Sequence, residues 1–214
     1  MNKKYFKRFS KTSLFILISS LIVFTIVAVL VATNNISWLD NGIYSVLSKI
    51  ICDPVTSIFK VITLFCETEV ILIILALLLI FLKKKKIATY IVINSGLCVL
   101  LNQVVKRIFV RPRPSGIALI TQGGYSFPSG HSMMALAFYG YIIYIINKSN
   151  MARKKKILFT CLLTIIIILV GISRIYLGVH YASDVIGAFS LGLVHLVLFI
   201  NYVYKKKESY SFYF

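Results

Sequence analysis

Long apolar segments alternate with short basic or polar segments along this chain. A helix needs about 20 apolar residues to cross the hydrocarbon core of a bilayer, and the apolar segments here reach or approach that length. The pattern therefore predicts an all-α integral membrane protein, a bundle of six transmembrane helices that forms a single domain over residues 1–214. We place the spans at approximately 14–32, 60–82, 87–105, 129–146, 157–172 and 184–204.

The first apolar segment follows a cluster of lysines and an arginine, as the hydrophobic region of a signal peptide does. The run over 14–32 is longer than such a region, and no small-residue cleavage site follows it. We therefore expect an uncleaved first span. The next segment, 34–57, mixes apolar residues with Trp38, Asp40 and Pro54. It is typical of a segment at the membrane interface, and a short amphipathic helix is one form that it can take.

The composition supports a membrane location. Of the 214 residues, 59% are hydrophobic and 14% are charged, whereas an average soluble domain is about half apolar and about a quarter charged. The mean hydropathy is +0.89. These values exclude an ordinary soluble globular protein, and the high hydrophobicity excludes a disordered one.

The formal net charge of +18, from 24 Lys and Arg against 6 Asp and Glu, indicates a membrane topology and no nucleic-acid partner. Most of the basic residues lie in the two terminal tails, at 83–86 and at 148–156. Lys and Arg collect in cytoplasmic loops, so both the N- and the C-terminus are predicted to be cytoplasmic. The chain is then a multi-pass protein of the cell membrane.

Several basic residues nevertheless lie in segments that this topology places outside the cytoplasm. Lys106, Arg113 and Arg174 stand close to other polar residues in the sequence. Arg presents a planar fork of donors that matches phosphate oxygens, and Lys supplies a point charge. Snorkelling at a helix end explains one such residue well and three together poorly. We therefore expect a binding site for a phosphate group on the outer side.

A second polar segment, PSGH at residues 128–131, precedes the apolar run of the fourth span. Ser129 suits a helix N-cap, and Gly130 allows a ligand to approach the backbone. Free N–H groups at a helix N-terminus bind anions, so this segment is a candidate phosphate site. A plain helix cap would explain Ser129 on its own.

Two of the three histidines, His131 and His180, lie beside these cations in the predicted topology. Histidine titrates near neutral pH, so one imidazole can attack or accept a proton while the other donates one. If residues 180–184 are helical, His180 and Asp184 share a face, and the carboxylate can orient the imidazole. Asp184 also suits the start of a helix. The set predicts phosphoryl transfer in which one imidazole attacks phosphorus and the other protonates the leaving oxygen.

The sequence offers little for a metal. The four cysteines form no C-x-x-C pair and have no histidine at metal-ligand spacing. A carboxylate cluster suited to Mg²⁺ or Zn²⁺ is also absent. We therefore expect neither a metal nor another cofactor.

Three more polar residues within the predicted spans need an interpretation. His195 lies eleven residues into the sixth span, and we interpret it as a buried residue that hydrogen-bonds between helices. Glu67 and Glu69 lie in the outer half of the second span, where an acid is a candidate functional residue. The sequence leaves two alternatives for these glutamates: they pair with Lys60, or they line the entrance of the site.

The three polar segments resemble the motifs of the type 2 phosphatidic acid phosphatase family, K-x₆-RP, PSGH and SR-x₅-H-x₃-D. All three are complete here and occur in this order, from Lys106 to Asp184. The resemblance implies that His180 is the nucleophile, that His131 is the general acid and that Asp184 is the partner of His180. It also implies the phosphate-binding residues, which are Lys106, Arg113, Ser129, Gly130 and Arg174. The motif spacing selects Arg113 over Arg111, which is left to assist or to touch lipid headgroups.

The resemblance further implies a membrane lipid phosphatase whose site faces the extracytoplasmic side and that works through a phosphohistidine intermediate. Its expected substrates are phosphatidic acid, phosphatidylglycerophosphate or undecaprenyl diphosphate. One alternative is a phosphotransferase on the same scaffold, which would move phosphate between lipids. Another is a non-enzymatic transporter, but a transporter needs a polar pathway or broken helices at mid-membrane, and the spans are largely apolar.

Overall fold

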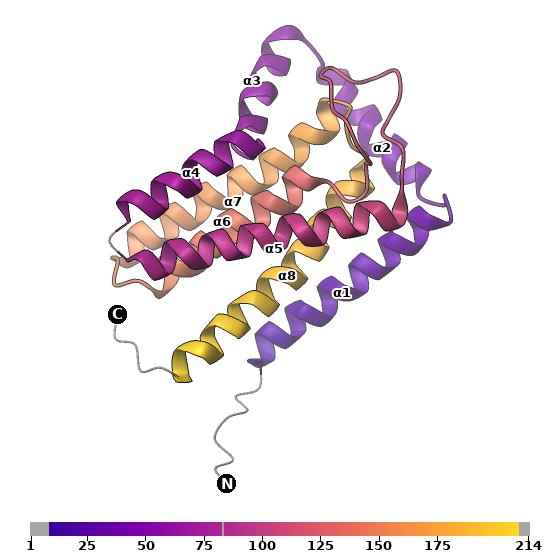
Figure 1. Ribbon diagram of the computed structural model, residues 1–214. Coiled ribbons are helices and arrows are strands. Elements are labelled where there is room, and N and C mark those ends of the chain that lie inside the picture. The colour runs from indigo at the N-terminus through magenta and orange to yellow at the C-terminus, as the bar shows by residue number, and fades with distance from the viewer. Residues whose placement is uncertain (1–8, 83, 210–214) are drawn as a thin grey trace.

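The computed structural model describes residues 9–82 and 84–209, and it shows a bundle of helices (Figure 1). These residues include no β-strand, so the all-α prediction is confirmed. The helices are α1 (Lys11–Ala32), α2 (Ser37–Leu47), a 3₁₀ turn (Ser48–Ile50), α3 (Asp53–Leu64), α4 (Thr68–Phe81), α5 (Lys85–Phe109), α6 (Gly130–Lys148), α7 (Arg153–Tyr176) and α8 (Ala182–Ser209).

The helices run back and forth along the bundle (Figure 1). At one end, α1 begins, α8 ends, and α4 connects to α5 and α6 to α7. At the other end lie α2, the long connection between α5 and α6, and the turn between α7 and α8. Helix α8 packs against α1 and α6, and α6 also packs against α5 and α7. Helix α6 is therefore surrounded by other helices.

Four helices in the described part of the chain are long and apolar enough to cross a membrane, namely α1, α5, α7 and the part of α8 that ends at Val203. The pair α3 and α4 passes the same test together, although the two helices are bent by 42° at the break between them. The described residues thus contain four candidate spans, or five if the bent pair is one span.

Helix α6 coincides with the predicted span at 129–146 but is not one of these candidates. Tyr139, Tyr141 and Tyr144 lower its hydropathy, and its buried residues include Met133 and Ala137. A helix enclosed by neighbouring helices meets little lipid and does not need apolar residues on every face. The count of six spans therefore remains a prediction.

The predicted span at 60–82 is not one continuous helix. Helix α3 begins earlier than expected, at Asp53, and a turn over residues 65–67 separates it from α4. The apolar run continues through most of this region, so hydropathy alone does not reveal the break. The turn places Glu67 between the two helices, with Thr63 buried just before it.

The segment predicted to be interfacial folds as α2 and the 3₁₀ turn. Helix α2 is amphipathic, because Asp40 is buried while Trp38 is exposed. It packs against α7 and α8. The expected short amphipathic helix is therefore present, and its buried face carries a carboxylate.

Glycines allow α8 to approach its neighbours closely. A Cβ on Gly171 of α7 would lie 2.6 Å from Cζ of Phe189, and one on Gly187 of α8 would lie 2.5 Å from Cε2 of Phe127. Small residues at helix contacts are typical of packing in membranes, where backbones must come close to gain van der Waals energy. These contacts fix the start of α8 against α7 and the α5–α6 connection.

Candidate active site

The α5–α6 connection, residues 110–129, is attached to the α7–α8 turn by backbone hydrogen bonds. The N–H of Leu119 donates to the oxygen of Leu177 at 2.9 Å, and the N–H of Ser129 donates to the oxygen of Asp184 at 3.1 Å. Gly178 has a φ of 68°, and a Cβ there would overlap the carbonyl of Ile117. Only glycine fits this position. The two chain segments that carry the motifs are thereby held together.

The imidazole of His180 lies between a carboxylate and a guanidinium. Its Nδ1 is 3.3 Å from Oδ2 of Asp184, and its Nε2 is 2.9 Å from Nη1 of Arg113. His180 is 2% exposed and Asp184 is fully buried. The carboxylate accepts a hydrogen bond from the N–H at Nδ1, which leaves the lone pair of the neutral imidazole on Nε2. This is the tautomer in which Nε2 can act as a nucleophile.

Burial lowers the pKa of His180 below the usual histidine value. Asp184 acts in the opposite sense, and the positive charges of Arg113 and Lys106 lower the pKa further. The imidazole is therefore neutral at neutral pH, and its lone pair on Nε2 faces the guanidinium of Arg113. Burial also lowers the pKa of Arg113, with Asp184 opposing it, but guanidinium remains charged because its usual pKa is far above 7.

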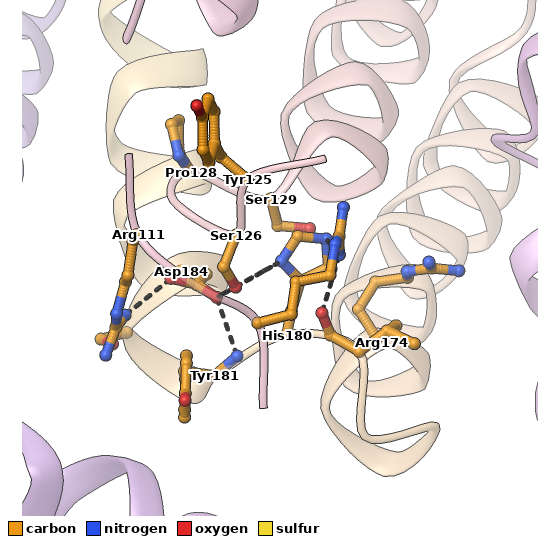
Figure 2. A network of polar contacts seen from close by, with 12 residues as sticks. Arg111, Tyr125, Ser126, Pro128, Ser129, Arg174, His180, Tyr181 and Asp184 are labelled. Atoms are coloured by element: carbon orange, nitrogen blue, oxygen red, sulfur yellow. Dashed lines mark hydrogen bonds and ion pairs between the residues drawn. The ribbon is translucent and has the colours of Figure 1, made fainter. Parts of the chain in front are cut away.

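Asp184 accepts hydrogen bonds from several segments of the chain (Figure 2). Its Oδ2 accepts from the N–H of Tyr181 at 2.8 Å and from the hydroxyl of Ser126, while Oδ1 accepts from Nη1 of Arg111 at 2.6 Å. Helix α8 begins only at Ala182, so residues 180–184 are helical in part. His180 and Asp184 are nevertheless in contact, because the hydrogen bond from the Tyr181 amide keeps the carboxylate close to the turn that carries His180.

Backbone carbonyls hold two of the cations. Arg113 donates from Nη1 to the oxygen of Val179 at 2.7 Å and from Nη2 to the oxygen of Gly123 at 2.8 Å. Lys106, at the end of α5, is buried and donates from Nζ to the oxygen of Tyr125. Both cations are thus anchored in the α5–α6 connection, and Arg113, which the motif spacing selects, is the arginine that contacts His180.

Arg174 is fully buried near the end of α7. Its Nη1 donates to Oγ1 of Thr63, and its Nη2 donates to Oε1 of Gln122 at 2.6 Å. Its Nε is buried and has no hydrogen-bond partner among the described residues. Thr63 comes from α3 just before the bend, so the bent helix pair helps to position this arginine.

The PSGH segment begins α6 as predicted. Ser129 is buried, and its hydroxyl accepts from the N–H of Ser132 as an N-cap. Space around Gly130 is limited, because a Cβ there would lie 3.3 Å from Oδ1 of Asn102. The predicted anion site at this helix N-terminus therefore has the cap and the small residue that such a site needs.

The structure places Glu67 beside His131. Nε2 of His131 lies 3.2 Å from Oε1 of Glu67, although the two atoms are not aligned as a hydrogen bond. The side chain of Glu67 is 30% exposed, so it lies at the edge of the site. Glu69 is exposed on the first turn of α4.

Asp40 and Arg111 take part in the site although the motifs assign them no role. Nη2 of Arg111 lies 2.8 Å from Oδ2 of Asp40, and its Nη1 lies 2.6 Å from Oδ1 of Asp184. The signals in the sequence are weak: a second Arg-Pro pair at 111, and an acid in an otherwise ordinary amphipathic segment. Ser126 and Ser183, which also contact these carboxylates, have no distinctive signal.

His195 lies away from this set, as expected. Its Nε2 is 3.0 Å from Oδ1 of Asn94, and Nδ2 of Asn94 donates to the oxygen of Ala137 at 2.8 Å. The chain of contacts joins α8, α5 and α6. The interpretation of His195 as a residue that hydrogen-bonds between helices is therefore confirmed.

Within residues 9–82 and 84–209, no group of His, Cys, Asp or Glu is arranged to hold a metal ion. The histidines of the motifs instead contact carboxylates and a guanidinium. The expectation of a metal-free and cofactor-free reaction remains a prediction.

The helical bundle thus brings the motif residues of the α5–α6 connection, the start of α6 and the α7–α8 turn to one end of the molecule, and this arrangement is typical of a membrane-embedded phosphatase. Residues 84–208 match the model of the PAP2 superfamily. The chain therefore belongs to this superfamily, and it is a lipid phosphatase of that kind.

The similarity to individual proteins extends over most of the chain. Phosphatidylglycerophosphatase B of Bacillus subtilis (strain 168) is 34% identical over 183 residues, which are 83% of this chain and 89% of that protein. The crystal structure of a transmembrane PAP2 type phosphatidylglycerolphosphate phosphatase from Bacillus subtilis matches with a TM-score of 0.80 and 31% identity, covering 88% of this chain and 96% of that one. This chain is therefore a multi-pass membrane protein.

A second solved structure, that of Aquifex aeolicus LpxE, matches with a TM-score of 0.64. It is 22% identical and covers 77% of this chain and 96% of its own. At this identity, the likeness concerns the fold alone. The same arrangement of helices thus occurs in proteins of different sequence.

Proposed function

We propose that this protein removes the terminal phosphate of phosphatidylglycerophosphate at the extracytoplasmic face of the membrane. The observation that carries the proposal is the His180 imidazole, held by Asp184 on one side and facing Arg113 on the other. The substrate is inferred from the two Bacillus subtilis relatives, whose names give phosphatidylglycerophosphate as theirs.

In the first step, Nε2 of His180 attacks phosphorus, a nitrogen–phosphorus bond forms, and the bond from phosphorus to the lipid oxygen breaks. Lys106, Arg113 and Arg174 stabilise the charge on the other phosphate oxygens, together with the N–H of Gly130 at the start of α6. His131 donates a proton to the leaving oxygen.

In the second step, His131 accepts a proton from water, and the water oxygen attacks the phosphorus of the phosphohistidine. The nitrogen–phosphorus bond breaks, inorganic phosphate leaves, and His180 regains its neutral state. Asp184 stays ionised throughout and orients the Nδ1 proton. The protein groups supply all of the charge and proton transfers, so the mechanism needs no metal.

The buried Nε of Arg174 supports the phosphate-binding role. A buried donor without a partner costs about 1–3 kcal/mol, and such groups are rare in folded proteins. Arg174 lies at the site, and its other two nitrogens are held by Thr63 and Gln122. A phosphate oxygen would give the remaining N–H an acceptor.

The topology that we propose has six spans with both termini in the cytoplasm. The end of the bundle opposite the site carries Lys85, Lys86 and Lys148, together with the basic segment 153–156. Cytoplasmic loops attract such residues. Helix α6 would be the enclosed sixth crossing, and the site would then face the outer leaflet.

Phosphate release by the detergent-purified protein in EDTA tests the proposal. The lipids to compare are phosphatidylglycerophosphate, phosphatidic acid and undecaprenyl diphosphate. We expect release to be fastest from phosphatidylglycerophosphate and to be lost in His180→Ala, because the nucleophile is removed. His195→Ala is the matched control, since this histidine lies in a separate polar cluster, and its rate per folded molecule should stay near that of the wild type.

Three outcomes would count against parts of the proposal. Substantial turnover by a folded His180→Ala variant would show that another group is the nucleophile. Loss of activity in EDTA that returns with a divalent cation would show that a metal takes part. Transfer of phosphate to a lipid acceptor instead of water would identify a phosphotransferase.

A further inference from the structure

We propose that Arg111 is a positioning residue: anchored by Asp40 of α2, it fixes the carboxylate of Asp184 and, through it, the imidazole of His180. The inference deepens the proposed function and rests on it, because it concerns the same site. It assigns Arg111 to the support of the nucleophile and not to the binding of phosphate.

Both terminal nitrogens of the Arg111 guanidinium donate to protein groups. Its Nη1 donates to Oδ1 of Asp184 at 2.6 Å and to the hydroxyl of Ser183 at 2.8 Å, and its Nη2 donates to Oδ2 of Asp40 at 2.8 Å. One face of the guanidinium lies over the ring of Tyr181, with 4.1 Å from Cζ to the ring centroid. A phosphate group would have to displace a carboxylate to reach these donors.

Asp40 is the anchor of this arrangement. It is 4% exposed, and its two oxygens accept from the N–H of Ser183 at 2.8 Å, the hydroxyl of Ser183 at 2.9 Å and Nη2 of Arg111. A buried carboxylate is tolerated only when it is paired and hydrogen-bonded. Asp40 thus ties α2 to both the first turn of α8 and the α5–α6 connection.

The two oxygens of Asp184 have separate partners. Oδ1 faces Arg111, while Oδ2 faces Nδ1 of His180 (Figure 2). An ion pair of this geometry prevents the carboxyl group from rotating, and a fixed Oδ2 holds the imidazole in the reactive tautomer and orientation. Removing Arg111 would leave Asp184 held only through Oδ2, by Tyr181, Ser126 and His180, and would loosen the carboxylate without removing any phosphate ligand.

Arg111 also offsets part of the negative charge that Asp184 presents to His180. The charged groups that act directly on the pKa of this imidazole are Asp184, Arg113 and Lys106, whereas Arg111 acts through Asp184, its ion-pair partner. Without Arg111, the carboxylate would favour the imidazolium more strongly, and the pKa of His180 would rise. The acid limb of the pH–rate profile would then move to higher pH.

The test uses the full chain in detergent and compares Arg111→Gln, Arg111→Lys and Asp40→Asn with the wild type on phosphatidylglycerophosphate across pH. Arg107→Gln is the matched control, because it removes an exposed positive charge from the last turn of α5, four residues before Arg111. We expect Arg111→Gln to lower kcat by about 10- to 100-fold, as when an orienting partner is removed, with KM within about threefold. Its acid limb should lie at higher pH than that of the wild type.

The other variants separate charge from geometry. Arg111→Lys keeps the charge but cannot bridge two carboxylates, so its acid limb should stay in place while kcat recovers only in part. Asp40→Asn should also lower kcat, as Arg111→Gln does. The double variant Asp40→Asn/Arg111→Gln should be no slower than Arg111→Gln alone, because both residues act through one pathway.

Several results would overturn the proposal. A raised KM with unchanged kcat would place Arg111 on the substrate, and a loss of kcat without movement of the acid limb would reduce its role to packing. Unchanged kinetics in Arg111→Gln would remove the role altogether. Thermal unfolding shows which variants fold, and Arg111→Lys and Asp40→Asn carry the test if Arg111→Gln does not. Failure of the wild type to release phosphate from any lipid tested would instead contradict the proposed function.

Discussion

At the scale of single residues, the site contains two arginines, two positions apart, with different tasks. Arg113 contacts Nε2 of His180, the proposed reacting atom, whereas Arg111 contacts the carboxylate of Asp184 on the other side of the ring. Both side chains reach the region of the α7–α8 turn, Arg111 at Asp184 and Arg113 at Val179 and His180. A spacing of two residues thus suffices to supply one guanidinium to each side of the imidazole.

The neutral state of His180 predicts the shape of the pH profile. The proposed nucleophile must be unprotonated, and burial lowers its pKa, so the acid limb of the profile should lie below the usual histidine value of about 6.5. The measurement is kcat/KM of the wild type against pH, which reports the free enzyme. An acid limb centred at or above the usual value would contradict a buried neutral nucleophile.

The motif residues could be predicted from the sequence because their spacing is fixed by the chemistry that they share. Lys106, Arg113, His180 and Asp184 all lie where the motifs place them. Asp40 could not be predicted in this way, because it is 71 residues from Arg111. Its role depends on how α2 packs, and no local pattern in the sequence encodes that.

At the scale of helices, hydropathy predicted where apolar segments lie but not how they bend or what surrounds them. The break between α3 and α4 falls in a region of high hydropathy, and α6 is less apolar than a lipid-exposed span because other helices enclose it. Both differences arise from tertiary packing. Both also serve the site, since the bend supplies Thr63 and α6 begins with the PSGH segment.

The close contact between α7 and α8 predicts a stability difference between two glycine substitutions. Gly171→Ala should destabilise the protein by about 1–3 kcal/mol, because the new Cβ would force Phe189 from its position. Gly96→Ala on α5 is the matched control: a Cβ there meets nothing within 4 Å, and alanine favours a helix. Equal thermal unfolding of the two variants in detergent would contradict the packing described here.

At the scale of the whole molecule, the proposed orientation can be tested with the chain's own cysteines. Cys52 is exposed, and its N–H lies 3.4 Å from the hydroxyl of Tyr176 at the end of α7, so it is at the same end of the bundle as the site. Cys66 and Cys98 are buried, and Cys161 lies within the candidate span of α7. A maleimide that cannot cross membranes should therefore label intact cells through Cys52.

The control is Cys52→Ser, which should not be labelled. Labelling of the wild type only after the cells are lysed would place this end of the bundle in the cytoplasm. That result would overturn the proposed topology while leaving the chemistry of the site untouched.

Asp184 has a consequence for how the sequence can change over time. The carboxylate that lies beside His180 also accepts hydrogen bonds from the amide of Tyr181, just before α8, and from the guanidinium of Arg111. Selection for abundance alone, without selection for turnover, would therefore retain a hydrogen-bond acceptor at this position. Variants that lose the reaction through Asp184 will tend to lose expression as well, so changes at this position will seldom give a protein that is inactive and still well folded.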